Sequence, residues 1–438
     1  MNFLLKIFFY VFLSLLGSDL FSQGKWEAME IPTQVDLNAV HFVDSINGWV
    51  VGNGGTILHT TDGGENWIEQ ESTTTNDIID VFFLNANLGW ASSFEFSDLP
   101  YGTLLLKTTN GGDEWISERY QDDNIFINCI LFTDSLNGWM GGSPHAIVRS
   151  IDGGNTWQQT EMDTTNLAFF PVLSINFYDD QYGYACGGLF DIAGVVWRTN
   201  NGGQKWYAID SDQAPADEIH ELVIFDSLSV MGAGGDPDFG YGVGIIRTID
   251  GGYNWEYEEI GIQGNAYDIE FVNTNEVWAP LGPSKKFIYS LDGGQNWEDR
   301  LTPNETSIYD IIFPDSLHGY AVGRSGAFLK FIDAITVGID SPEAEMEGVI
   351  LKQNYPNPFT SKTKIGFELP RDYKNILKVN IIVYDINGNQ VFTLEHLNPT
   401  SGLNTISFDA EDLPSGIYYY QLMIGEEILQ IKKMILMR

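Results

Sequence analysis

The octet Thr60-Thr-Asp-Gly-Gly-Glu-Asn-Trp67 decides the fold, because it recurs five more times along the chain. The other copies end at Trp115, Trp157, Trp206, Trp255 and Trp297. Successive copies lie 48, 42, 49, 49 and 42 residues apart. A period of 40 to 50 residues is typical of arrays in which each repeat forms one four-stranded blade.

A second pattern precedes each octet and occurs seven times. A short alternating apolar run and a polar turn lead to one large side chain, as in the stretches 40–49 and 130–139. The seven large side chains are Trp49, Trp90, Trp139, Tyr184, Met231, Trp278 and Tyr320. In the first repeat the strand-like segments are 40–43, 48–52, 56–60 and 67–71. These repeats predict an all-β chain that contains a seven-bladed β-propeller.

The seventh octet is missing, and its absence indicates how the ring closes. Asp333 falls where a seventh octet should lie, but no Gly-Gly-x-x-Trp follows it. Gly24-Lys25-Trp26 instead stands 16 residues before Phe42, as Trp67 stands 16 residues before Phe83. We therefore expect the first strand of the chain to complete the last blade, which removes free sheet edges.

The octet has the chemistry of a tight turn. Its Gly pair allows positive φ, and its third side chain can accept backbone N–H bonds. The third position is occupied by Asp62, Asn110, Asp152, Asn201, Asp250 and Asp292. These octets resemble the Asp-box, or BNR, repeat, and their array is similar to the YVTN-like propellers that include the photosystem II stability and assembly factor family. The resemblance implies that the box residues are structural.

Charge and composition divide the chain near residue 340 and exclude several partners. The whole chain has 22 basic and 60 acidic residues, a net charge of −38. Residues 24–345 account for −37 of this and contain all 12 Trp. So acidic a chain repels nucleic acid and anionic membrane surfaces. Its only two cysteines, Cys129 and Cys186, exclude a disulfide scaffold; we expect core thiols, although a disulfide between them remains open.

We expect four segments along the chain. Residues 1–22 form a signal peptide, with a short apolar stretch after Lys6 and a small residue, Ser22, before the cut. Residues 23–335 form the propeller, 336–347 an acidic linker and 348–438 a small Ig-like β-sandwich. No other long apolar run exists, so no transmembrane span is expected after signal removal, and we expect a monomer.

The last segment has a motif at each end. It begins with Asn354, Tyr355, Pro356, Asn357, Pro358 and Phe359, and it ends with the strand-like stretch 431–438. An Asn-Gly hairpin at 384–391 and a turn at 412–416 lie between them. This segment resembles the C-terminal sorting domain of the type IX (Por) secretion system of Bacteroidetes. The resemblance implies that the type IX machinery is a partner and that the protein reaches the cell surface or the medium.

Catalytic motifs are scarce. Sialidases carry an Arg-Ile-Pro motif that is missing here, and Arg149, Arg198 and Arg247 each precede an octet, which favours a blade-supporting role. The six His form no metal-binding pattern, and there is no phosphate-binding loop and no nucleophile elbow. No cofactor is predicted, although calcium is compatible with the acidic loops. We therefore expect a non-enzymatic binding or scaffold protein, with an Asp-box glycan hydrolase or an envelope-complex assembly factor as alternatives.

The candidate ligand-binding residues lie in loops that are longer than a propeller needs. Repeats two, four and five have long connections at 92–101, 187–194 and 234–242. Their candidate side chains are Phe94, Phe96, Tyr101, Phe190, Asp191, Asp236, Asp238, Phe239 and Tyr241. Aromatic faces with carboxylates suit a glycan or protein ligand. The alternative is that the aromatic rings only pack the loops against the scaffold.

Overall fold

The computed structural model describes residues 24–332, with gaps at 98, 164–165, 190–191 and 237–241, and residues 349–436. The second range has gaps at 353, 355–356, 358, 360, 371–377, 385–389, 398, 411–412, 415 and 425–426. The expected signal peptide and linker therefore lie outside the described residues. Two compact units emerge, of which one is Gly24–Asp333 and the other includes Ala334–Arg438. Among the described helices, none has the length and apolar character to span a membrane.

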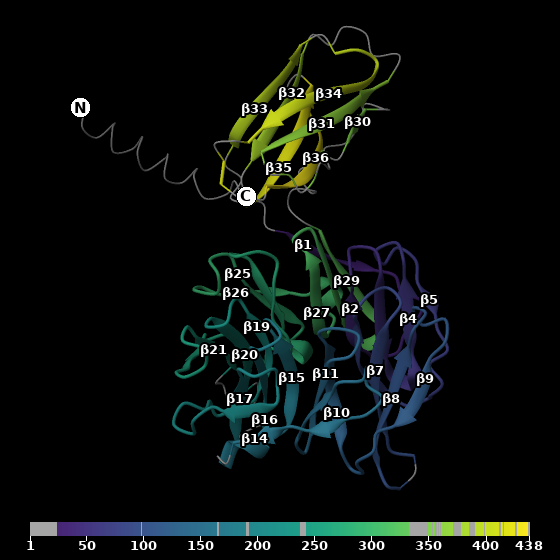
Figure 1. The fold of residues 1–438 in the computed structure, drawn as a ribbon, viewed down its shortest axis with the longest axis vertical. Coiled ribbons are helices and arrows are strands. Elements are labelled where there is room, and N and C mark those ends of the chain that lie inside the picture. The colour runs from purple at the N-terminus through teal and green to yellow at the C-terminus, as the bar shows by residue number, and fades with distance from the viewer. Residues whose placement is uncertain are drawn as a thin grey trace, which may run out of the picture. The chain divides into compact units, whose positions relative to one another are not determined.

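Gly24–Asp333 forms seven sheets, drawn in Figure 1, and the innermost strands of all seven line one central cavity. This arrangement confirms the predicted seven-bladed propeller. Blades are numbered by their inner strands in chain order. The inner strands are β2 (Leu37–Phe42), β6 (Ile78–Phe83), β10 (Phe126–Phe132), β15 (Val172–Phe177), β19 (Ile219–Ile224), β23 (Glu270–Phe271) and β27 (Ile308–Asp315). The second strands are β3 (Gly48–Gly52), β7 (Gly89–Glu95), β11 (Gly138–Ser143), β16 (Gly183–Leu189), β20 (Val230–Asp236), β24 (Val277–Pro280) and β28 (His318–Gly323).

The remaining propeller strands lie further from the channel. The third strands are β4 (Ile57–Thr60), β8 (Gly102–Thr108), β12 (Ala146–Ser150), β17 (Ala193–Thr199), β21 (Gly242–Thr248), β25 (Lys286–Ser290) and β29 (Ala327–Ile332). The outer strands are β5 (Ile68–Glu69), β9 (Ile116–Arg119), β13 (Gln158–Gln159), β18 (Lys205–Ala208), β22 (Glu256–Glu259), β26 (Glu298–Leu301) and β1 (Lys25–Met29). Blade 4 gains a fifth strand, β14 (Glu161–Met162), which runs parallel to β18.

The ring closes as the missing octet predicts. Strand β1 pairs antiparallel with β29, from Lys25 opposite Ile332 to Met29 opposite Phe328. Trp26 on β1 is 7% exposed and stacks on Phe287 of blade 6 with ring centroids 5.2 Å apart. The first strand of the chain therefore completes blade 7 and also packs against blade 6.

Aromatic stacking joins neighbouring blades. In blades 1, 2 and 7 the large residue on the second strand lies flat on a Phe near the end of the next blade's inner strand, as for Trp49 on Phe83 at 3.5 Å between ring centroids. Trp90 and Phe132 repeat this contact at 3.6 Å. The octet Trp then meets the same Phe edge-on, as Trp115 meets Phe83. Such pairs contribute about 0.5–1.5 kcal/mol each beyond buried area.

Each octet forms a turn built around its third side chain. In blade 1 the Thr60 hydroxyl donates to Asp62 at 2.8 Å and accepts from Gly64 N at 3.0 Å. Asp62 also accepts from the backbone and side chain of Asn66 at 2.9 and 2.8 Å. These bonds lower the pKa of Asp62 to about 2. The backbone bond from the residue four positions on recurs at Asn110, Asp152, Asn201, Asp250 and Asp292.

The recurring arginines contact the scaffold. Arg247 donates to the carbonyl of Gly294 in the next octet, and Arg198 lies 3.9 Å from the ring centroid of Tyr253 in the next octet. Arg149 donates to Asn137 of its own blade at 3.1 Å. All three therefore support blades, as their position in the repeat predicts.

The tail forms the predicted sandwich of two antiparallel sheets. One sheet contains β30 (Ile350–Leu351), β31 (Lys362–Leu369) and β34 (Gly402–Asp409). The other contains β33 (Gln390–Leu397), β32 (Lys378–Tyr384), β35 (Gly416–Ile424) and β36 (Glu427–Leu436). Buried residues from both sheets share one hydrophobic core.

The sorting motif packs into this sandwich. Asn354 is buried, its N–H donates to the Tyr420 hydroxyl at 2.8 Å, and its side chain donates to Thr363 at 3.0 Å. Phe359 is buried and forms a bridge with Leu436 on the last strand. Asn357 is described as partly exposed, whereas Tyr355, Pro356 and Pro358 lie outside the described residues. The described motif residues thus fix the start of the tail to its core and its final strand.

Candidate functional site

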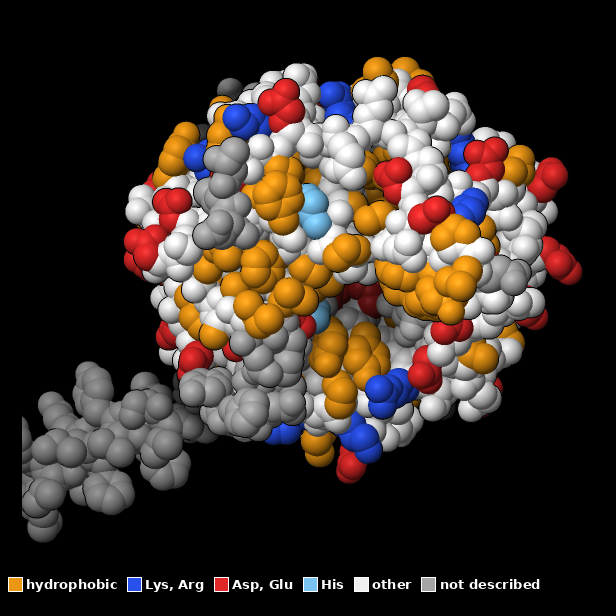
Figure 2. Space-filling model, turned by 90° about the horizontal axis from the view of Figure 1, so that it is seen from below, with side chains coloured by type: hydrophobic (Ala, Val, Ile, Leu, Met, Phe, Trp, Pro, Cys, Tyr) orange, Lys and Arg blue, Asp and Glu red, His pale blue; other side chains and the backbone are white. Residues whose placement is uncertain are grey.

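The seven inner strands enclose a central cavity of about 690 Å³. The connections from second to third strands, and from outer strands to the next blade, open on one face of the ring, called here the mouth face. Figure 2 shows hydrophobic side chains gathered around a hollow in this face, with acidic side chains visible inside it. The mouth face is therefore where a ligand would meet both kinds of side chain.

Five carboxyl groups line the cavity: Asp80, Glu221, Asp268, Glu270 and Asp310. No Lys or Arg lines it among the described residues. Burial raises the pKa of Asp80 and of Glu221 to about 7, that of Glu270 to about 8 and that of Asp310 to about 6. The pKa of Asp268 also lies well above its usual range, because of burial and then of its acidic neighbours. The channel therefore holds protons at neutral pH.

Four of these carboxyls join neighbouring blades. Glu221 accepts from the side chains of Ser174 and Asn176 of blade 4 at 2.7 and 2.6 Å, and the other three accept backbone N–H groups. The Asp80 side chain accepts from Ile130 N of blade 3 at 2.7 Å. Asp268 accepts from Ile311 N of blade 7 at 2.8 Å, and Asp310 from Val40 N of blade 1 at 2.6 Å. Each of these last three bonds satisfies a backbone N–H on the innermost strand of the next blade. These carboxyls are consequently occupied in holding the ring together.

Sequence reasoning missed the channel carboxyls, although a signal was present. Ala39, Asp80, Cys129, Ser174, Glu221, Asp268 and Asp310 occupy one repeat position, next to the inner-strand bulge. If the repeats are aligned on their large second-strand residue, Asp80, Glu221, Asp268 and Asp310 fall at the same position, which places them in one ring around the channel. Cys129 and Cys186 are both free thiols in the structure, and burial raises both pKa values.

The aromatic side chains of blade 2 form a cluster beside the mouth. Phe96 lies over Phe126 at 4.9 Å and meets Phe94 and Tyr101 edge-on, at 6.1 and 5.7 Å between ring centroids. Phe96 is nevertheless 57% exposed and Tyr101 38% exposed. Phe126, at the start of β10, is a member that sequence reasoning missed. We call Phe94, Phe96, Tyr101 and Phe126 the aromatic cluster.

The structure corrects the prediction of long loops. In blades 2, 4 and 5 most of the extra residues prolong the second and third strands instead of forming loops. Leu189 pairs with Ala193, and Asp236 pairs with Gly242, so only a short tip remains in each hairpin. The physical reason is that Gly188 and Gly235, at φ of 137° and 134°, allow two backbones to approach closely and continue the ladder.

The other candidate side chains are not brought to the aromatic cluster by anything the structure describes. Phe190, Asp191, Asp238, Phe239 and Tyr241 lie outside the described residues, and of Asp236 only the backbone is described. Among the described side chains no group of three or more His, Cys, Asp or Glu could hold a metal ion. A calcium contact at the hairpin tips therefore stays a prediction.

The fold and the box turns define a class: propellers of tandem Asp-box repeats, here followed by a separate sandwich domain. A family profile described as "Photosynthesis system II assembly factor YCF48" matches residues 19–124, 118–226 and 253–332. The chain belongs to this family. A second profile, "Secretion system C-terminal sorting domain", matches residues 353–437. The protein is accordingly exported by type IX secretion to the cell surface or the extracellular space.

Two curated relatives are similar to parts of the propeller. The photosystem II assembly lipoprotein Ycf48 of Synechococcus sp. (strain CC9902) is 26% identical over 195 residues, which cover 44% of this chain and 43% of that protein. The Ycf48 protein of Thermosynechococcus vestitus (strain NIES-2133 / IAM M-273 / BP-1) is 40% identical over 42 residues, covering 10% of this chain and 12% of that protein. The chain thus spans less than half the length of the curated relatives that it matches.

Solved structures share the propeller fold. A structure titled "YCF48 bound to D1 peptide" has a TM-score of 0.55 at 23% identity and covers 70% of this chain and 96% of its own. YCF48 from Cyanidioschyzon merolae has a TM-score of 0.55 at 19% identity, covering 70% and 98%. The WD40 propeller domain of Doa1 has a TM-score of 0.52 at 12% identity, covering 71% and 97%. At these identities the likeness shows the fold alone.

Proposed function

We propose that the exported propeller is a non-enzymatic binding protein that holds a polypeptide segment at its mouth face. The observation that carries this proposal is the aromatic cluster, which leaves Phe96 57% exposed although it packs on three other rings. A large exposed aromatic ring beside a concave site is typical of a protein contact. Membership of an assembly-factor family supports a binding or assembly role.

The charge around the cluster selects the kind of polypeptide. Glu95 follows Phe94 on β7 and binds Asn76 and Ser97, and hydrogen bonds from these partners lower its pKa, so it is ionised. Glu69, Glu71 and Glu95 line an adjoining pocket of about 710 Å³ that has no Lys or Arg among its lining residues. A segment with aromatic or aliphatic residues and a basic residue therefore complements this face. A structural neighbour that was solved bound to a peptide is consistent with a polypeptide ligand.

A retention experiment tests the proposal. The full chain would be immobilised and offered a phage library of 12-residue peptides and, separately, a polysaccharide panel with and without calcium. We expect enrichment of peptides and at least tenfold weaker retention by the Phe96→Ala variant. Ile249→Ala is the matched control, because Ile249 is 83% exposed beside an octet turn, away from the mouth face.

Each other outcome would count against the proposal. Equal retention of peptides by Phe96→Ala and the parent would remove the aromatic cluster from the binding surface. Retention on polysaccharides alone would make the ligand a glycan. Released reducing sugar would replace binding with hydrolysis and direct attention to the channel carboxyls.

A further inference from the structure

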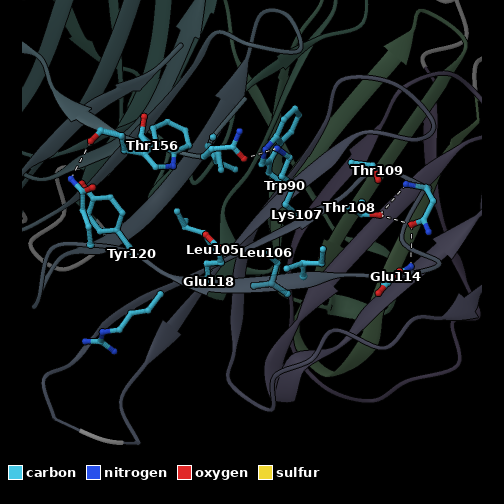
Figure 3. Close-up of a pocket in the computed structure, with 18 residues that line it drawn as sticks. Trp90, Leu105, Leu106, Lys107, Thr108, Thr109, Glu114, Glu118, Tyr120 and Thr156 are labelled. Carbon is cyan, nitrogen blue, oxygen red and sulfur yellow. Dashed lines mark hydrogen bonds between the residues drawn. The ribbon is translucent and has the colours of Figure 1, made fainter. Parts of the chain in front are cut away.

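A second concave site lies between blades 2 and 3, on the outer side of the ring. It is a groove of about 360 Å³ whose walls come from β8, β9 and the octet of blade 3. Figure 3 shows Tyr120 and Thr156 at one end, Thr108, Thr109 and Glu114 at the other, and Leu105 and Leu106 between them. Trp157, which also lines the groove, is only 5% exposed.

The neighbouring gap, between blades 1 and 2, is filled by the chain itself. Gln70, three residues after the octet Trp67, extends its carboxamide into that gap. Its nitrogen donates to Gly111 O at 2.8 Å, and its oxygen accepts from the indole N–H of Trp115 at 3.2 Å. The amide lies so close over Gly112 that it would clash with any side chain there. The carboxamide of Gln70 thus pairs with both a backbone carbonyl and the indole N–H in the octet of the next blade.

Between blades 2 and 3 the equivalent residue is Glu118, three residues after Trp115. Its side chain is exposed, since a carboxylate in the gap would lose its hydration without a cationic partner. The indole N–H of Trp157 is buried and has no hydrogen-bond partner among the described residues. Gly153 O already accepts from Lys107 Nζ at 2.7 Å and from Trp90 Nε1 at 3.3 Å. Gln121, which also lines the groove, donates to the backbone carbonyl of Trp157 at 3.1 Å. The indole N–H of Trp157, like those of Trp67 and Trp297, is left without an acceptor among the described residues.

The charges at the rim restrict the ligand further. Lys107 is bound to Gly153 O, and Arg119 is bound to the carbonyls of Pro100 and Tyr101 and to Asp123. Glu114 and Glu118 are exposed lining residues that form no ion pair among the described residues. The rim therefore attracts positive charge.

We propose that this groove binds a polypeptide through a glutamine side chain flanked by basic residues. The ligand's amide oxygen accepts from Trp157 Nε1, as Gln70 accepts from Trp115, and its basic neighbours lie near Glu114 and Glu118. The inference goes beyond the proposed function, because it needs neither the aromatic cluster nor the channel.

The test uses the full chain labelled with ¹⁵N at tryptophan, and the peptide acetyl-Lys-Gln-Lys-amide at millimolar concentration as the probe. The Trp157 indole signal is assigned from its loss in Trp157→Phe. We expect that signal to shift saturably, while the indole signal of Trp67, another octet tryptophan, stays in place. Acetyl-Lys-Glu-Lys-amide, which carries a carboxylate in place of the amide, should bind at least about fivefold more weakly, because a carboxylate in the groove loses its hydration and is repelled by Glu114 and Glu118.

Two variants separate the effect of filling the groove from the effect of removing a negative charge at its rim. The side chain of Glu118→Gln should fill the groove as Gln70 fills the gap between blades 1 and 2. It should therefore shift the Trp157 signal in the absence of peptide and lower the affinity for the probe peptide at least about fivefold. Glu114→Gln removes one negative charge but places no carboxamide in the groove, so we expect a smaller loss of affinity for the probe peptide. Phe96→Ala should bind the probe as the parent does, which separates this site from the mouth face. An unmoved Trp157 signal, or equal binding by Glu118→Gln and the parent, would overturn the proposal.

Discussion

Replacing Trp26 with Ala should lower the stability of the whole propeller, because this side chain joins the start of the chain to its end. Trp26 stacks on Phe287 and meets Trp278, Phe313 and Phe331 edge-on, at ring-centroid distances between 5.2 and 6.2 Å. It is 7% exposed, on a strand whose five pairs with β29 are the described link that closes blade 7. Loss of the ring would leave a cavity inside this cluster.

The magnitude follows from the burial of that ring. Truncation of a buried Trp or Phe to Ala costs about 3–5 kcal/mol. Unfolding entropy is about 2.1 cal/mol/K per residue near 60 °C, which gives about 0.65 kcal/mol/K for a propeller of this size. The expected fall in melting temperature is therefore about 5–8 °C. Deletion of residues 24–30 should cost more, since it also exposes the edge of β29.

Tryptophan fluorescence is the natural assay, because all 12 Trp lie in the propeller and the tail contributes none. Glu27→Ala on the same strand is the matched control. Its side chain is 47% exposed and pairs with Lys25 at 2.6 Å, and such surface pairs contribute about 0–1 kcal/mol. A Trp26→Ala variant that melts with Glu27→Ala would refute the argument that β1 closes the ring.

Two further predictions concern the channel and the boxes. Because burial raises the pKa values of Asp80, Glu221, Glu270 and Asp310, the folded propeller keeps protons that the unfolded chain has lost, so stability should fall as the pH rises from about 4 to 8. Melting curves at pH 6 and 8.5 should show a smaller fall for Glu270→Gln, and an equal fall would contradict the assignment to the channel. Asp152→Asn should leave the melting temperature unchanged, since Asn110 and Asn201 accept the same backbone bonds, whereas Asp152→Ala should lower it; equal melting of both variants would be inconsistent with the turn role.

The ring could be predicted from the sequence because the repeats can be aligned with one another. The second strand of blade 1 was predicted at 48–52 and is β3 (Gly48–Gly52). The spacing between Trp26 and Phe42 likewise placed β1 in blade 7, where it pairs with β29. Both inferences depend on the sequence period. That period predicts the structure because each repeat forms one blade and each blade packs against its neighbours in a similar way.

The connections between the second and third strands of blades 4 and 5 were predicted less accurately. The stretches 187–194 and 234–242 were predicted to be loops because they are longer than the connection that a propeller needs. In the structure those residues continue the ladder, with Gly187 opposite Val195 and Gly235 opposite Val243. Composition alone cannot distinguish a Gly that turns the chain from one that lets two strands approach. That difference depends on tertiary pairing.

The groove between blades 2 and 3 shows why a site in a repeat protein escapes pattern reading. Every repeat contributes the same walls to the gap that follows it, so the motif common to all repeats says nothing about which gap is open. Gln70 closes one gap and Glu118, at the equivalent position, leaves the next one open. The other repeats hold Met29, Thr160, Ile209, Glu258 and Arg300 at this position, so no common residue marks a closed gap. The effect of Glu118 depends on Trp157, 39 residues further along the chain. Only the packing of two blades brings those two positions to the same groove.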